Sequence, residues 1–105
     1  MIFMSRFANL PKVKATQVTV VTAGVPVQGT DVLVPAGTDV VILAHPSNTG
    51  TISVAESSTN ALNTGTTSML LEAGQSLAVQ VRNFSALWFD STVSSDKVRL
   101  FTEKE

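Results

Sequence analysis

Apolar and polar residues alternate along most of this chain with the two-residue period that is typical of β-strands. In residues 77–82 every second residue is Leu or Val. Residues 98–101 repeat the pattern, with Val98 and Leu100 predicted to face a core and Phe101 to face outwards. Gly, Pro, Asn and Ser separate about eight such segments, and we find no amphipathic segment with a period near 3.6 residues. The pattern therefore predicts an all-β, antiparallel β-sandwich or barrel.

Two stretches of the sequence resemble each other. Val-Pro-Ala-Gly-Thr-Asp-Val at residues 34–40 aligns with Leu-Glu-Ala-Gly-Gln-Ser-Leu at residues 71–77. Residues 52–54 and 87–89 occupy equivalent places further along, as short apolar strands. We interpret the two stretches as related hairpins, lying in one sheet or across two. A repeated hairpin favours a jelly-roll-like or doubled Greek-key sandwich.

The strand predicted at residues 40–44 is apolar on both faces, which is unusual when only one face of a sheet meets the core. Its second face carries Val41 and Leu43. These side chains need a cover, from the N-terminal segment, a loop or a neighbouring subunit. On the neighbouring strand 52–55, Ile52 and Val54 are predicted to point inwards, with Ser53 and Ala55 towards solvent.

Residues 1–14 differ from the rest and are predicted to form an N-terminal arm, followed by a sandwich domain at residues 15–105. Pro11 argues against a long helix in this segment. The arm either folds back on its own domain or lies on a neighbouring subunit. Its apolar residues are Ile2, Phe3, Met4, Phe7 and Leu10.

Composition limits the classes of partner. The chain of 105 residues is 44% hydrophobic but only 14% charged, and its formal net charge is −1. A polar but largely neutral surface can be buried against another protein at little desolvation cost, whereas it offers no cationic patch to nucleic acid. No apolar run is long enough to span a membrane. The start lacks the pattern of a signal peptide, so we expect synthesis in a cytoplasm.

Candidate catalytic chemistry is sparse. His45 is the single imidazole, and no nucleophile motif accompanies it, so we interpret it as a structural hydrogen-bonding group. The aspartates are scattered, without a calcium-loop motif, although a calcium site between loops stays open as an alternative. With no cysteine in the chain, a Cys-ligated zinc site is excluded. We predict no catalytic residue, no metal site and no cofactor.

Two aromatic residues are predicted to point away from the core. For Trp88 we weigh cover by its own chain, a protein interface, and stacking on a sugar ring. Sugar sites usually combine several aromatic residues, and this chain has one Trp and no Tyr. The polar loop at residues 57–68 is the other candidate binding feature, because loops of this length are usually functional or mobile.

The Ala-Gly turns, the Asn-Thr-Gly turn before a short strand, the Leu-Trp-Phe-Asp strand and the final Val-Arg-Leu-Phe strand together resemble the small β-sandwich virion structural proteins of tailed bacteriophages. These proteins often decorate or cement a capsid. The resemblance is carried by the segments VPAGTDVVILAHPSNTGTISVAESS, LLEAGQSLAVQVRNFSALWFD and KVRLF. It covers most of the chain after residue 30 and leaves out the arm.

The resemblance implies a non-enzymatic virion subunit, made in the host cytoplasm, that binds the major capsid protein and its own copies. It implies no nucleic-acid or membrane partner. An alternative is a tail, neck or fibre module that binds host-surface carbohydrate through Trp88 and the loop at residues 57–68. The residues predicted to form the protein interface are Ile2, Phe3, Met4, Phe7, Leu10, Val41, Leu43, Trp88 and Phe101.

Overall fold

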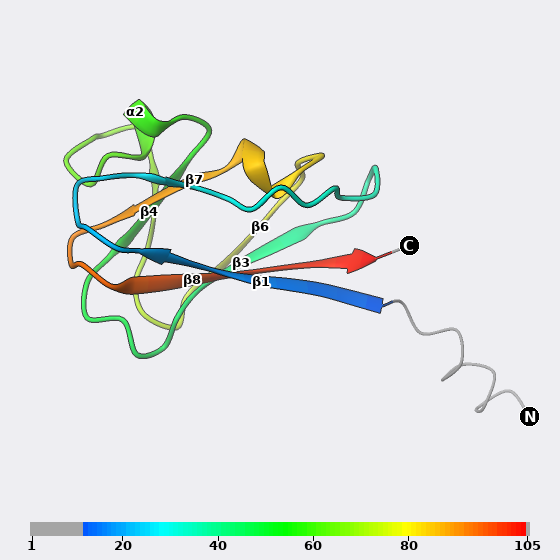
Figure 1. Cartoon of the computed structure of the whole chain (residues 1–105), viewed down its shortest axis with the longest axis horizontal. Coiled ribbons are helices and arrows are strands. Elements are labelled where there is room, and N and C mark those ends of the chain that lie inside the picture. The colour runs from blue at the N-terminus through cyan, green and yellow to red at the C-terminus, as the bar shows by residue number, and fades with distance from the viewer. Residues whose placement is uncertain (1–11, 105) are drawn as a thin grey trace, which may run out of the picture.

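The computed structural model describes residues 12–104, which form eight strands in two four-stranded antiparallel sheets (Figure 1). In chain order the elements are β1 (Lys12–Val20), β2 (Val27–Gln28), β3 (Val40–Ala44), β4 (Ile52–Ala55), α2 (Ser58–Ala61), β5 (Met69–Leu71), β6 (Ser76–Val79), a 3₁₀ turn (Phe84–Ala86), β7 (Trp88–Ser91) and β8 (Asp96–Lys104). The predicted all-β sandwich is confirmed. The sandwich begins at Lys12, so residues 12–14, predicted as the end of the arm, belong to β1.

The strand pairing is nested about the middle of the chain. Sheet A has the order β1-β8-β3-β6 and sheet B the order β2-β7-β4-β5. The pairs β1–β8, β2–β7, β3–β6 and β4–β5 enclose one another like a long hairpin wrapped across two sheets. This nesting is the strand arrangement of a jelly roll.

The repeated stretches do not form hairpins, and this part of the prediction is wrong. β3 lies in sheet A and β4 in sheet B, so the first stretch crosses the sandwich, and β6 and β7 do the same in the second. The equivalent strands pair with each other instead. Val41 lies opposite its counterpart Ala78, and Val54 lies opposite its counterpart Phe89. A local two-fold relation therefore passes through both pairs.

Both copies of the Ala-Gly turn place their glycine at positive φ. Gly37 has φ 79° and Gly74 has φ 83°. In each turn the amide that follows the glycine closes on a carbonyl three residues earlier, Thr38 on Pro35 at 3.1 Å and Gln75 on Glu72 at 2.9 Å. Positive φ at the third turn residue is what a type II turn requires, and glycine adopts it without strain.

The core lies between the two sheets. Alternation in β3 places Val40, Ile42 and Ala44 inside, each with no exposed surface, as predicted. The two largest fully buried side chains are Phe84 and Phe89. β2 is short and lies at a sheet edge, as Pro26 and the following glycine in that segment indicate.

Part of the outer face of sheet B, at β4, is covered as well, contrary to the sequence prediction. Ser53 and Ala55, predicted to face solvent, are 1% and 8% exposed. The short helix α2, which lies within the predicted polar loop, packs against β4 and β7, and the Ser53 hydroxyl donates a hydrogen bond to the carbonyl of Ala61. A polar segment without strand periodicity can thus cover a sheet face when its backbone carbonyls accept the buried hydroxyls.

Candidate protein-binding surface

The outer face of sheet A carries an apolar row that crosses all four strands. The register places Ala15, Phe101, Val41 and Ala78 side by side on β1, β8, β3 and β6. The two alanines are exposed, Val41 is 38% exposed, and Phe101 is half-buried. Val41 and Phe101 are two of the predicted interface residues, and the pairing of β3 with β8 brings them together.

The next row along the same face is polar except for Leu43, which is half-buried. It contains Gln17, Arg99 and Ser76. The Arg99 guanidinium donates to Oε1 of Gln17 at 3.3 Å and lies 3.2 Å from Nε2 of His45. Leu43 is therefore bordered by a hydrogen-bonded polar group, whereas Val41 has apolar neighbours on both sides.

His45 is satisfied at both ring nitrogens. Nε2 lies 3.2 Å from the Arg99 guanidinium. Nδ1 lies 2.7 Å from the Ser47 hydroxyl and 3.0 Å from the Ser47 backbone nitrogen. Within residues 12–104, no carboxylate is hydrogen-bonded to the ring. The arrangement is that of a structural histidine at a strand end.

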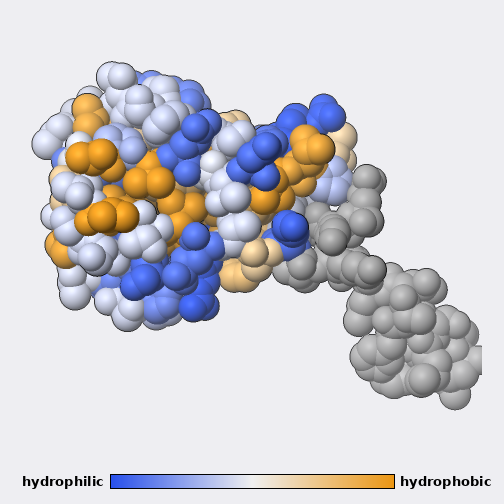
Figure 2. Space-filling model, in the orientation of Figure 1, coloured by the Kyte–Doolittle hydropathy of each residue, from blue (hydrophilic) through white to orange (hydrophobic). Residues whose placement is uncertain are grey.

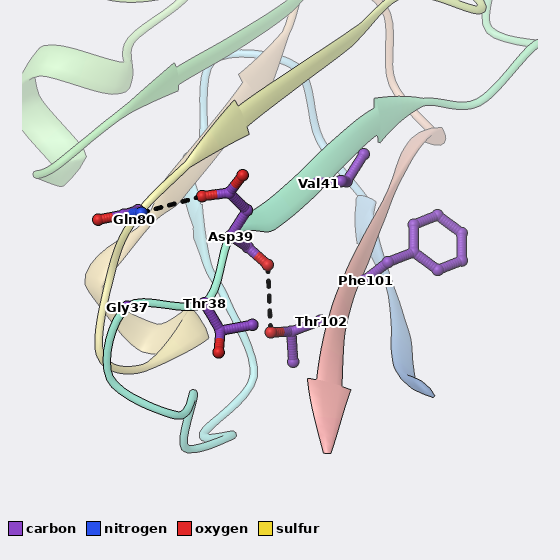
Figure 3. Close-up of a pocket in the computed structure, with 7 residues that line it drawn as sticks. All are labelled: Gly37, Thr38, Asp39, Val41, Gln80, Phe101 and Thr102. Carbon is purple, nitrogen blue, oxygen red and sulfur yellow. Dashed lines mark hydrogen bonds between the residues drawn. The ribbon is translucent and has the colours of Figure 1, made fainter. Parts of the chain in front are cut away.

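A shallow groove of about 550 Å3 opens beside Val41 and Phe101, the two middle residues of the apolar row (Figure 3). Its lining residues are Gly37, Thr38, Asp39, Val41, Gln80, Phe101 and Thr102. The Gln80 amide donates to Oδ1 of Asp39 at 3.1 Å, and the Thr102 hydroxyl donates to the Asp39 backbone carbonyl at 3.3 Å. The groove thus combines an apolar side, formed by Val41 and Phe101, with an exposed carboxylate that an amide holds in position.

Asp39 and Gln80 were not singled out from the sequence. They lie 41 residues apart and meet because β3 and β6 pair. The alternating pattern of both strands does place each residue on the outer face. It cannot show that the two share an end of the sheet, because that depends on which strands become neighbours.

Trp88 lies on the other sheet and does not join this surface. It is half-buried on the outer face of β7, opposite Gln28 and Ala55 in register. α2 packs against the same strand. Part of the ring is thus covered by its own chain, and part of it is accessible. The predicted interface residues Ile2, Phe3, Met4, Phe7 and Leu10 lie outside the described residues.

Two buried carboxylates hold the connections between strands. Asp90 is fully buried and accepts hydrogen bonds from the backbone amides of Gly24, Asn63 and Ser91 at 2.8 to 2.9 Å. Asp96 accepts from the amides of residues 49 and 50 and from the Ser91 hydroxyl. Every partner is a hydrogen-bond donor, so these aspartates serve as structural anchors. Across residues 12–104 we find no group of three metal-ligating side chains.

A second apolar patch lies at the far end of the sandwich from the start of β1. Val21 is 70% exposed, Val25 57% and Val93 38%. The turns that carry them are joined, since the Ala23 amide donates to the Ser94 hydroxyl at 2.9 Å. Figure 2 shows apolar side chains gathered at this end of the molecule. The alternating sequence pattern does not predict this patch, because isolated valines in turns resemble strand residues.

Comparison with protein-family models, curated proteins and solved structures finds no match to this chain. No helix among the described residues has the length and apolar character needed to span a bilayer.

Proposed function

We propose that this protein is a non-enzymatic structural subunit of a bacteriophage virion, a decoration subunit that binds the major capsid protein lattice and its own copies. The observation that carries the proposal is the apolar row on the outer face of sheet A. A row of two alanines, a valine and a phenylalanine across four strands is a surface suited to burial against another protein. The sequence resemblance to small virion sandwich proteins is the reason for proposing a capsid as the partner.

Such a subunit acts mechanically. Covering the apolar row removes hydrocarbon from water, which stabilises a contact by about 25 cal/mol per Å2 of apolar area. The row contains no charged side chain, so little desolvation cost opposes this gain. A subunit that touches two or more lattice neighbours gains further from effective concentration. No catalytic step is assigned, and the contacts of His45 with Arg99 and Ser47 support a structural role for that residue.

Binding to phage heads tests the proposal. The purified full chain is mixed with phage heads that lack it, and cosedimentation is measured for the wild type and for Val41→Asp and Ala78→Arg. Val93→Asp is the matched control, because Val93 and Val41 are equally exposed at 38% and lie on different surfaces. We expect the wild type and Val93→Asp to bind and the other two variants to lose binding. Thermal unfolding of each variant establishes that it is folded. Failure of the wild type to bind, or undiminished binding by both sheet A variants, refutes the proposal.

A second candidate function is favoured by the accessible part of Trp88. As a tail, neck or fibre module, the protein would stack this ring on host-surface carbohydrate, with polar groups supplied by the neighbouring residues 57–68. A glycan array probed with the wild type, Trp88→Ala and Val41→Asp separates the two functions. Glycan binding that depends on Trp88 and not on Val41 supports this candidate.

A further inference from the structure

We propose that the groove on the outer face of sheet A is the docking site for residues 2–10 of a neighbouring copy of this chain. This inference rests on the proposed function, because it takes the same surface to be the one that joins subunits. It names one occupant of that surface and specifies that the N-terminal segment of one copy enters the groove of another.

The groove selects for a particular chemistry. Val41 and Phe101 present apolar surface, and Asp39 presents a carboxylate at the opposite side. Because the Gln80 amide holds Oδ1 of Asp39, the carboxylate is oriented before a ligand arrives. A ligand that fits carries apolar side chains and one cation, and it carries no acid that would be repelled by Asp39.

Residues 2–10 have this composition. Their sequence, Ile-Phe-Met-Ser-Arg-Phe-Ala-Asn-Leu, contains five large apolar residues, one arginine and no acidic residue. Arg6 is flanked by apolar residues at short range, so a cation and an apolar anchor can reach the two sides of the groove together. A guanidinium can engage a carboxylate with two parallel hydrogen bonds, which fixes direction as well as adding affinity.

The length and starting point of the segment also fit. β1 begins at Lys12, and the groove residues Phe101 and Thr102 lie opposite Ala15 and Lys14, at the same end of sheet A. Eleven residues precede Lys12, and a chain of that length can span up to about 36 Å when extended. A four-stranded sheet is about 14 Å across. The segment starts at an edge strand of sheet A, and its extended length exceeds the width of the sheet, so it can extend beyond its own subunit.

Engineered cysteines test both the docking and its source, since the chain has no native cysteine. One full-length variant carries Ser5→Cys, and a second carries Thr38→Cys at the groove. When the two are mixed under mild oxidation, we expect a disulfide-linked heterodimer. The matched control is Ser5→Cys mixed with Thr66→Cys, at an exposed position in the loop between α2 and β5, which should give no heterodimer above background.

Exchanging the charges of Arg6 and Asp39 tests whether these two side chains pair. Adding Asp39→Arg to the groove variant should lower the heterodimer yield about tenfold, because two guanidinium groups then face each other. Adding Arg6→Asp to the partner should restore it. An unchanged yield with Asp39→Arg, or no rescue by the exchange, overturns the proposal.

The double variant Ser5→Cys/Thr38→Cys distinguishes the sources. A monomer closed by an internal disulfide, without heterodimer in the mixture, shows that each chain covers its own groove and overturns the proposal. Absence of both products overturns it as well. Head binding that depends on Val41 without any heterodimer leaves the proposed function standing and removes this inference. Heterodimer formation without head binding does the reverse.

Discussion

Substituting Asp90 tests whether this carboxylate holds the loop at residues 57–68 against sheet B. Its Oδ1 accepts from the amides of Gly24 and Ser91, at 2.9 and 2.8 Å, and its Oδ2 accepts from the amide of Asn63 at 2.8 Å. In Asp90→Asn the amide oxygen can replace Oδ1 and keep two of these bonds. The NH2 group then takes the place of Oδ2, where it faces the Asn63 N–H as donor against donor.

The cost follows from this count. One charge-assisted hydrogen bond is lost, at about 1.5–3 kcal/mol, and a buried backbone donor is left without a partner. We expect Asp90→Asn to lower the free energy of unfolding by about 2–4 kcal/mol. For a domain of this size, this corresponds to a fall in Tm of roughly 10–20 °C. Asp90→Ala leaves all three amide donors without a partner, because these backbone groups remain when the carboxylate is removed. It should therefore lower the free energy of unfolding further.

Urea unfolding followed by circular dichroism measures the effect, and Asp31→Asn is the control. Asp31 is exposed and accepts one side-chain bond, from Asn83 at 2.8 Å. Its substitution should therefore cost less than about 0.5 kcal/mol. Limited proteolysis should also cleave residues 57–68 faster in Asp90→Asn, since the Asn63 attachment is lost. Equal stability of Asp90→Asn and wild type, or an equal loss in both variants, would refute the assigned anchoring role.

Three further predictions concern backbone and pH. Gly37→Ala and Gly74→Ala should each lower the free energy of unfolding by about 1 kcal/mol, measured by urea titration, because the added methyl group must adopt positive φ. Nothing crowds the added Cβ at either position, so a negligible effect would contradict the turn geometry. Gly29→Ala should be far more damaging, with loss of soluble protein or of cooperative melting, because the Cβ overlaps the Phe84 carbonyl; a wild-type melting curve would contradict this. Hydrogen bonds from its own backbone amide and from the Asn60 side chain hold the pKa of Glu56 below its ordinary value of 4.5. Ionised Glu56 therefore contributes stability above that value, and this stability is lost as pH falls through the lowered folded pKa. Glu56→Gln should remove this small contribution in urea titrations at several pH values, and Asn60→Ala should remove part of it, whereas identical pH profiles for Glu56→Gln and wild type would refute it.

Alternation predicted the strands and their inner faces well because a two-residue period is a local property. Val40, Ile42 and Ala44 are buried and Val41 is exposed, as the period requires. The Ala-Gly turns were equally predictable, since positive φ favours glycine wherever it occurs. Pro26, directly before β2, also fits the edge position of this strand, because proline cannot donate to a ladder.

Strand partners and loop cover could not be predicted in the same way. Two strands joined by a short turn resemble a hairpin in sequence, and only the packing of both sheets decides that β3 and β4 separate. Ser53 resembles a solvent-facing residue because its cover, at Ala61, follows eight residues later in a polar segment. Asp90 gives no sequence signal either, because all three of its donors are backbone amides that any residue supplies.

The internal repeat explains why the candidate groove has a direction. The two-fold relation through the Val41–Ala78 pair makes Asp39 equivalent to Ser76, and Gln80 equivalent to Leu43. One end of the β3–β6 pair therefore carries a carboxylate held by an amide, and the other carries a hydroxyl beside an apolar residue. If both ends were alike, two copies could meet face to face in a symmetric dimer. Because only one end carries the carboxylate, a ligand with a single cation binds in one orientation. Self-association through this groove then joins two unlike surfaces, the N-terminal segment and the groove, and it closes by reciprocal exchange between two copies or continues as a ring or an extending chain.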